Sequence, residues 1–223
     1  ILTGMVPLNH GLRDNAGFRL AAEVPTLAEH LSEQGYQTAA FVSAYVLDSA
    51  WGLDQGFSVY RDPFHPEEVA ASGAFGEVEL PSAEVVNTAR AWWREAGKSS
   101  PGEAGASGTH APRFAWVHLY DPHTPWRERP DWEGDPYRGE VAYADTELGK
   151  LVEEVGKKAL IVVTSDHGEG LWTEGEREHG VLINPAVTRV PLIVRPPGGL
   201  RGGPETVPAA AGQTWKVGGT EGL

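Results

Sequence analysis

The segment Ala159–Gly170, ALIVVTSDHGEG, decides the fold of this chain. Its apolar part, Ala159–Val163, is short, uninterrupted and rich in β-branched residues, which is typical of a strand buried on both faces inside a parallel sheet. Asp166 and His167 follow directly, and ligands of open α/β sheets bind just outside the carboxyl ends of strands. Both side chains are good ligands for a divalent cation. The alternative interpretation is a local turn in which Asp166 caps backbone amides.

The neighbouring segments alternate between helical and strand patterns. Thr26 and Glu29 form a capping-box pattern that predicts a helix over Val24–Gly35, and a strand pattern follows at Gln37–Val42. Such alternation is typical of α/β architecture. The other predicted elements are helices over Ser82–Ala96 and Tyr137–Val155 and strands over Arg113–Leu119 and Val190–Val194.

A second predicted strand end carries another candidate residue. The strand over Arg113–Leu119 is followed by Tyr120–Trp126, YDPHTPW, in which two prolines stiffen the turn around His123. This places His123 at the carboxyl end of a strand, where chemistry is expected. On this motif alone, a histidine that is merely hydrogen bonded into the turn is an equal alternative.

Two further segments carry specific expectations. The helix over Tyr137–Val155 shows a mostly apolar face in which Asp145 is the exception and could lie at the interior edge. The loop after His167 contains His179 and several glutamates, which we expect to form a solvated face. The residues of that apolar face are Val141, Ala142, Leu148, Leu151 and Val152, and the glutamates are Glu169, Glu174, Glu176 and Glu178.

The composition limits the possible partners. The chain has 223 residues, enough for one large domain or two small ones, and a net charge of −13, which argues against nucleic acid and anionic membranes as partners. It has no cysteine, so these residues form neither disulfides nor thiolate metal sites. No apolar run is long enough to span a bilayer.

Taken together, the motifs resemble the sulfatase family of the alkaline phosphatase superfamily, and they occur in the family's order over most of residues 1–197. The matching pieces are Ile1–Gly11 (ILTGMVPLNHG), Pro25–Ala39, His118–Pro125 (HLYDPHTP), Glu140–Asp145, Thr164–Glu169 (TSDHGE), His179–Gly180 and Arg189–Leu192 (RVPL). From the alternation and the resemblance we expect a three-layer α/β/α sandwich with a mixed, largely parallel central sheet. Residues 1–197 would form the catalytic domain, and residues 198–223 an irregular Gly/Pro-rich tail.

The resemblance implies roles for four residues. Asp166 and His167 would supply two ligands of a divalent metal ion, usually calcium in sulfatases and zinc or manganese in phosphoesterase relatives. His123 and His179 would contact the anionic ester group, and one of them would protonate the leaving oxygen. A cation and imidazolium donors stabilise the negative charge that develops on the non-bridging oxygens during such transfers. The expected function is metal-dependent hydrolysis of a sulfuric ester of a small molecule or glycan.

Two departures from the family pattern leave alternatives open. The family nucleophile, a Cys matured to formylglycine, a Ser or a Thr, would lie just before Ile1, so we expect these residues to lack the first strand and the nucleophile and to be inactive alone. Many sulfatases carry Lys and His in a G-K-W-H-L-G segment, where this chain has the uncharged Ser43 and Tyr45. A phosphodiesterase or phosphotransferase of the same superfamily, or a non-catalytic remnant, is therefore the alternative. The compartment is not predicted.

Overall fold

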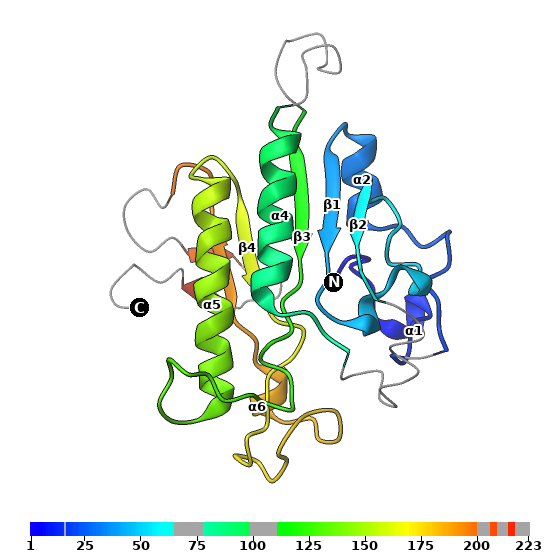
Figure 1. Cartoon of the computed structure of the whole chain (residues 1–223). Coiled ribbons are helices and arrows are strands. Elements are labelled where there is room, and N and C mark those ends of the chain that lie inside the picture. Colours follow the sequence, from blue (N-terminus) through cyan, green and yellow to red (C-terminus); the bar gives the residue numbers. More distant parts are fainter. Residues whose placement is uncertain (16, 65–77, 99–110, 200–205, 209–213, 217–223) are drawn as a thin grey trace. The chain divides into compact units, whose positions relative to one another are not determined.

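The structure of the chain is a computed structural model (Figure 1). It describes residues 1–15, 17–64, 78–98, 111–199, 206–208 and 214–216. Two compact units follow one another along the chain, Ile1–Glu154 and Val155–Leu223. Within the described ranges, no helix combines the length and the hydrophobicity needed to cross a membrane.

A parallel three-stranded sheet forms the centre of the first unit (Figure 1). Strand β1 (Gln37–Phe41) lies between β2 (Val59–Arg61) and β3 (Arg113–Val117), and Ala39 faces Val59 on one side and Ala115 on the other. The predicted strands at β1 and β3 are confirmed. Strand β2 was not predicted, because three residues are too few to show an alternating pattern.

Helices cover this sheet and confirm the predicted α/β fold. Helix α4 (Ser82–Ala96) packs on β1 and β3 through its buried valines, and Trp92 lies 5.9 Å from Phe41 between ring centroids. Helix α2 (Leu27–Glu33) packs against β1 and begins at the predicted capping box, in which the Glu29 amide donates to Thr26 Oγ1 at 3.1 Å. Shorter helical segments are α1 (Pro7–His10), η1 (Tyr45–Leu47) and η2 (Ser49–Trp51).

Helix α5 (Pro136–Val155) confirms the predicted helix but buries a different face. Asp145 is exposed, as is Val141 at 41 %, whereas Glu140 and Glu147 are only 2 % and 5 % exposed. Glu147 is buried beside Lys150, 2.6 Å away, and Glu140 lies 3.4 Å from Arg129, so a basic side chain accompanies the burial of each glutamate. A prediction based on polarity alone therefore turned the helix toward the wrong side. The buried residues are Gly139, Glu140, Ala144, Glu147 and Leu151.

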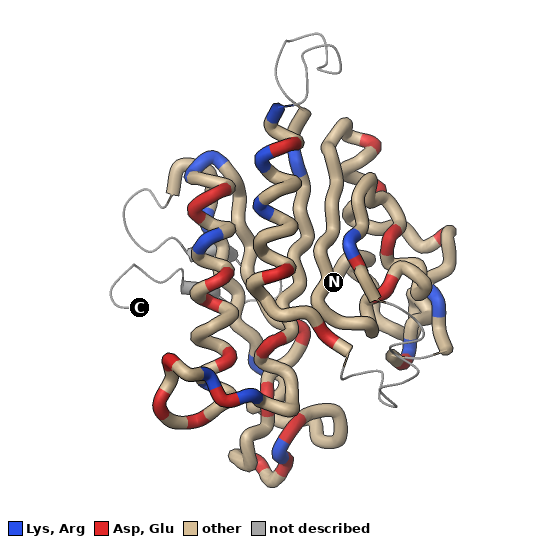
Figure 2. The backbone as a smooth tube through the Cα atoms, viewed as in Figure 1, with Lys and Arg blue, Asp and Glu red and all other residues tan. Residues whose placement is uncertain are grey.

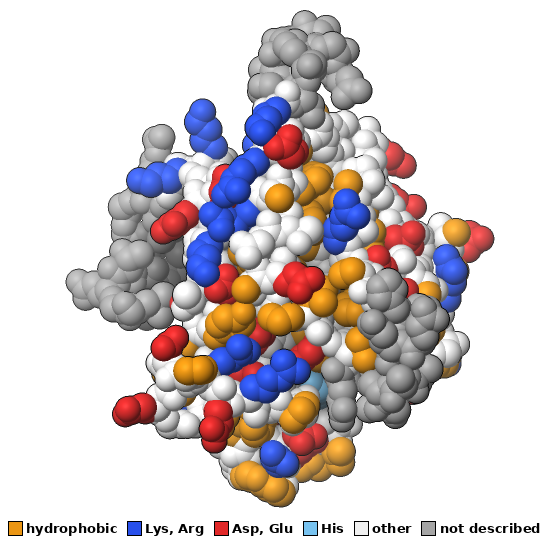
Figure 3. Space-filling view, viewed as in Figure 1, with side chains coloured by type: hydrophobic (Ala, Val, Ile, Leu, Met, Phe, Trp, Pro, Cys, Tyr) orange, Lys and Arg blue, Asp and Glu red, His pale blue; other side chains and the backbone are white. Residues whose placement is uncertain are grey.

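Salt bridges connect the C-terminal ends of α4 and α5. Glu154 pairs with Arg94 and, at 3.5 Å, with Arg90. Figure 2 shows acidic and basic residues along both helices, and in Figure 3 basic side chains gather where the two helices end. Because these pairs lie near the surface, they contribute little to stability.

The second unit contains an antiparallel pair, β4 (Ile161–Thr164) and β5 (Leu192–Arg195), in which Val162 faces Val194. The strands predicted here are confirmed, but burial of the first one on both faces is wrong, because Val162 is 55 % exposed. A strand in a two-stranded ribbon has one strand neighbour, so an apolar run need not be enclosed. The other elements are α6 (Pro185–Thr188) and the antiparallel pair β6 (Thr206–Pro208) and β7 (Thr214–Lys216); most of the predicted tail 198–223 lies outside the described residues.

Candidate active site

His123 lies in the loop that follows β3, residues 118–129 (the His123 loop), where several aromatic rings contact one another. The ring of Tyr120 stacks on His123 with centroids 4.2 Å apart and planes at 15°, and His118 lies 5.9 Å from Tyr120. Nδ1 of His123 is 2.6 Å from the Thr124 carbonyl oxygen. A carbonyl oxygen only accepts, so the proton of the neutral ring is on Nδ1 and the lone pair is on Nε2.

Asp121 anchors the beginning of this loop. Its side chain is only 4 % exposed, and Oδ2 accepts the backbone N–H of Ser82 at 2.7 Å and also the Ser82 hydroxyl. The carboxylate therefore caps the N-terminus of α4, where a negative charge is favourable. Its other oxygen lies 2.6 Å from Nη2 of Arg129, so one aspartate ties the loop both to α4 and to its own far end.

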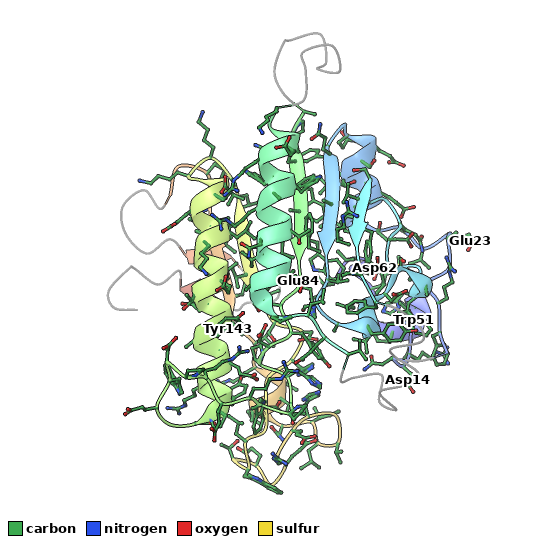
Figure 4. All side chains as sticks on the ribbon, viewed as in Figure 1. Asp14, Glu23, Trp51, Asp62, Glu84 and Tyr143 are labelled. Carbon is green, nitrogen blue, oxygen red and sulfur yellow. The ribbon has the colours of Figure 1, made fainter. Side chains whose placement is uncertain are left out.

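The far end of the loop is anchored on α5. Oε1 of Glu140 accepts the Arg127 amide at 3.1 Å and lies 3.4 Å from Nη2 of Arg129, whose guanidinium stacks 3.9 Å above the ring of Tyr143. Figure 4 labels Tyr143 on α5. Burial raises the pKa of Glu140 to about 7, because the loss of hydration outweighs the Arg127 amide and the Arg129 charge. No local sequence pattern pairs Arg129 with Glu140, so this cluster was not predicted.

In the second unit, Asp166 and His167 lie side by side after β4. The His167 amide donates to Asp166 Oδ1 at 3.0 Å, and His167 Nε2 lies 3.7 Å from Asp166 Oδ2. Nδ1 of His167 is 2.9 Å from the Gly168 carbonyl oxygen, so Nδ1 carries the proton and the Nε2 lone pair is on the side of the Asp166 carboxylate. This is the tautomer that a metal-binding histidine needs, with its other nitrogen held by a carbonyl.

His179 joins these residues. Its ring lies 4.0 Å from that of His167, and its Nδ1 is 3.3 Å from Oε1 of Glu169. The Glu169 side chain is only 5 % exposed, and Glu176 is buried as well, accepting two backbone amides of the same loop. The expectation of a wholly solvated acidic face is therefore wrong for Glu169 and Glu176, because these carboxylates organise the loop around His179.

Glycine is required at the turn that carries Asp166 and His167. A Cβ at Gly168 would collide with the Ala186 carbonyl oxygen, and one at Gly170 would collide with the Glu176 carbonyl oxygen. The loop backbone is therefore packed directly against later parts of the second unit, and the positions of Asp166 and His167 depend on that close approach.

The structure thus brings together Asp166, His167 and His179 in the second unit and holds His123 in the first. No three histidine or acidic side chains among the described residues converge as a complete metal site. At the positions of the family's Lys and His, Ser43 is fully buried with its hydroxyl 3.1 Å from His118 Nδ1, and the ring of Tyr45 packs against Trp51, 6.0 Å between centroids. Ser43 therefore belongs to the interior, whereas Tyr45 is half-buried.

Solved structures of low sequence identity share this fold. BT4656, determined with its substrate D-glucosamine-2-N,6-O-disulfate, superposes with a TM-score of 0.64 at 16% identity over 88% of this chain and 60% of its own. The 2-O GAG sulfatase BT1596 gives 0.52 at 19% identity over 88% and 52%. The phosphonate monoester hydrolase of Agrobacterium radiobacter gives 0.57 at 19% over 88% and 57%. The chain spans about half the length of the first solved structures that it matches.

Sequence comparison gives the family. No curated protein is significantly similar to the chain in sequence. The sequence profile of the family described as Sulfatase, however, matches residues 1–213, nearly the whole chain. The chain therefore belongs to the sulfatase family, within the alkaline phosphatase superfamily.

Proposed function

We propose that this chain contributes a metal and substrate site to the hydrolysis of sulfuric esters. The observation that carries the proposal is the pair Asp166 and His167, in which a carboxylate and an imidazole lone pair lie on the same side of an exposed turn. An oxygen and a nitrogen ligand in this arrangement suit a divalent cation, and we infer calcium from the family. When bound, such an ion would stabilise the negative charge that develops on the ester oxygens.

The family resemblance assigns roles at the ester group to the two other histidines, His123 and His179. Glu169 accepts a hydrogen bond from Nδ1 of His179, which orients the ring within the loop. His123 is oriented in the same way by the Thr124 carbonyl. Each imidazole could donate a hydrogen bond to a non-bridging oxygen or a proton to the leaving alcohol. The substrate is an anionic ester of a small molecule or glycan.

Hydrolysis of a phosphoester is the second candidate. The observation in its favour is that the uncharged Ser43 and Tyr45 stand where many sulfatases carry Lys and His, and that the Ser43 hydroxyl is buried and bonded to His118. A phosphodiester or a phosphonate would then be the substrate, and zinc or manganese the metal ion.

Metal binding tests the core of the proposal. The thermal midpoint of unfolding is measured with EDTA and with calcium, manganese or zinc. A cation at a hundredfold excess over its Kd should raise Tm by roughly 5–10 °C in a protein of this size. Asp166→Asn and His167→Gln should abolish the shift, because each removes a ligand.

Exposed residues of the same types provide controls. Asp131→Asn and His30→Gln change exposed side chains of the first unit, and both variants should keep the full metal-dependent shift. Equal shifts in all four variants, or no shift with any cation, would contradict the proposed metal site.

The substrate class is tested with the full-length protein in the presence of the preferred cation. Cleavage of 4-nitrophenyl sulfate is compared with cleavage of bis(4-nitrophenyl) phosphate. Faster hydrolysis of the sulfate supports the first proposal. Hydrolysis of the phosphodiester with the sulfate untouched supports the second, and loss of both activities in His179→Asn is expected in either case.

A further inference from the structure

The two carboxyl oxygens of Glu140 have different hydrogen-bonding surroundings. Both of its donors, the Arg127 amide and the Arg129 guanidinium, converge on Oε1, at 3.1 and 3.4 Å. Oε2 is buried and has no hydrogen-bond partner within the described part of the chain. A carboxylic acid costs less free energy here than a carboxylate, because an unpartnered oxygen is less expensive to bury when it is neutral than when it carries charge.

The charges around Glu140 support the same protonation state. Arg129 and Asp121 face it from the His123 loop, Arg127 contacts it from that loop as well, and Glu79 faces it from the segment before α4. Arg129 pairs with Asp121 at 2.6 Å, and Arg127 pairs with Glu79 at 2.7 Å. The charges cancel within each of these two pairs, so an ionised Glu140 would add an uncompensated negative charge at a site that is 2 % exposed.

We propose that Glu140 is a proton-binding positioning residue for His123: its protonated carboxyl holds Arg127–Arg129 on helix α5, and its ionisation loosens the loop. The importance of this effect for catalysis rests on the proposed function. The coupling between proton binding and loop position does not, and its test needs neither metal nor substrate.

The direction of the pH effect follows from the thermodynamic linkage between proton binding by Glu140 and closure of the loop. Burial raises the pKa of Glu140 to about 7 when the loop is closed, and an open loop would expose the carboxyl to water and return its pKa toward the ordinary 4.5. The closed loop thus binds the proton more tightly, so protonation favours closure and ionisation favours opening. Between pH 6 and pH 8 the closing equilibrium should weaken about tenfold.

A short path leads from Glu140 to His123. Arg129 pairs with Asp121, two residues before His123, and Trp126 donates from Nε1 to the Pro122 carbonyl at 3.1 Å. Trp126 also packs on Tyr137 of α5, with ring centroids 5.6 Å apart. Release of Arg127–Arg129 would therefore free the segment in which the His123 amide donates to the Tyr120 carbonyl at 2.8 Å.

Amide hydrogen exchange, followed residue by residue by NMR on the metal-free chain, tests the proposal. Protection factors of the Arg127 and His123 amides should fall about tenfold from pH 6 to pH 8 after correction for intrinsic exchange. Both should stay below that of the Val42 amide, which is bonded to Arg61 next to the sheet, because the loop opens before the sheet unfolds. In Glu140→Gln the protection should be constant over this range and as high as in the wild type at pH 6.

Glu147→Gln is the matched control. Glu147 is also a buried glutamate of α5 with one unpartnered oxygen, but its partner is Lys150, at 2.6 Å. This variant should keep the wild-type pH dependence. The proposal is overturned if the wild-type protection factors do not change with pH, if Glu140→Gln keeps the slope, or if only the Arg127 amide responds and the His123 amide does not. Metal binding at Asp166 could succeed in each of these cases, so the two proposals fail separately.

Discussion

Asp121→Asn should strongly destabilise the first unit. The Asp121 carboxylate is buried and has partners on both oxygens, with the amide and hydroxyl of Ser82 on one and Arg129 on the other. An asparagine has the same shape but only one acceptor oxygen. If the asparagine oxygen accepts the Ser82 amide and so keeps the cap of α4, the asparagine NH2 group faces the guanidinium of Arg129. If the side-chain amide is flipped, the oxygen faces Arg129 and the cap of α4 is lost.

The size of the effect follows from burial. Removing one partner of a buried ion pair costs about 3–5 kcal/mol, because the other charge stays behind unpaired. The Arg129 side chain is 23 % exposed and retains Glu140 Oε1 at 3.4 Å, so the lower end of that range applies. We expect the free energy of unfolding to fall by about 3 kcal/mol.

Urea denaturation followed by circular dichroism at 222 nm provides the measurement, because the two long helices α4 and α5 belong to the first unit up to Glu154. Asp135→Asn is the matched control. Asp135 also accepts a backbone amide at a helix start, from Tyr137 at 3.1 Å, and faces Arg138 at 4.0 Å, but its side chain is 45 % exposed. Its loss should cost less than about 0.5 kcal/mol. Equal losses in the two variants would refute the argument from burial.

Three further predictions follow from the same structure. The free energy of unfolding should fall by about 2.5 kcal/mol between pH 5 and pH 8, because the pKa of Glu140 is about 7 in the fold against an ordinary 4.5 and the native state therefore binds the extra proton. Urea titrations at several pH values should show this slope in the wild type and in Glu147→Gln but not in Glu140→Gln, and an unchanged slope in Glu140→Gln would contradict it. Gly56→Ala should lower the free energy of unfolding by at least about 1 kcal/mol more than Gly35→Ala does. Both glycines have φ of 81°, but only a Cβ at Gly56 would collide with the backbone of α2. Equal losses in the two variants would contradict this packing. Ser43→Ala should lower stability by about 1 kcal/mol through the lost bond to the His118 ring, and an unchanged urea midpoint would argue against that bond.

Local patterns predicted the elements of the fold well. The capping box at Thr26 and Glu29 and the amphipathic pattern of Ser82–Ala96 both lie in neighbouring residues. The helix over Ser82–Ala96 has the predicted bounds, and the capping box is present, but the helix predicted over Val24–Gly35 begins only at Leu27. The apolar run at Ala159–Val163 predicted a strand but not its surroundings. Exposure of Val162 depends on which strands pair with β4, and pairing between distant segments leaves no trace in the run itself.

Candidate site residues were easier to predict than the residues that support them. Asp166, His167 and His123 are candidates because polar residues that follow apolar strands stand out in the sequence, and their roles stay predictions. Glu140 could not, because its burial depends on Arg129, and on the helix alone it looks like a solvent-facing glutamate. Glu169 was missed for the same reason, since its partner His179 lies ten residues away. Supporting contacts of this kind are set by tertiary packing and not by local pattern.

The ion pair between Asp121 and Arg129 makes the His123 loop a closed module whose two ends meet. Between these ends, Pro125, Arg127 and Glu128 are exposed. Residues at the rim of such a module can change while its base remains seated in the protein. Libraries that vary Glu128, and leave Asp121 and Arg129 untouched, would therefore change the exposed rim of this loop while its anchored ends stay in place, which makes the rim a practical place to test whether the loop influences substrate preference.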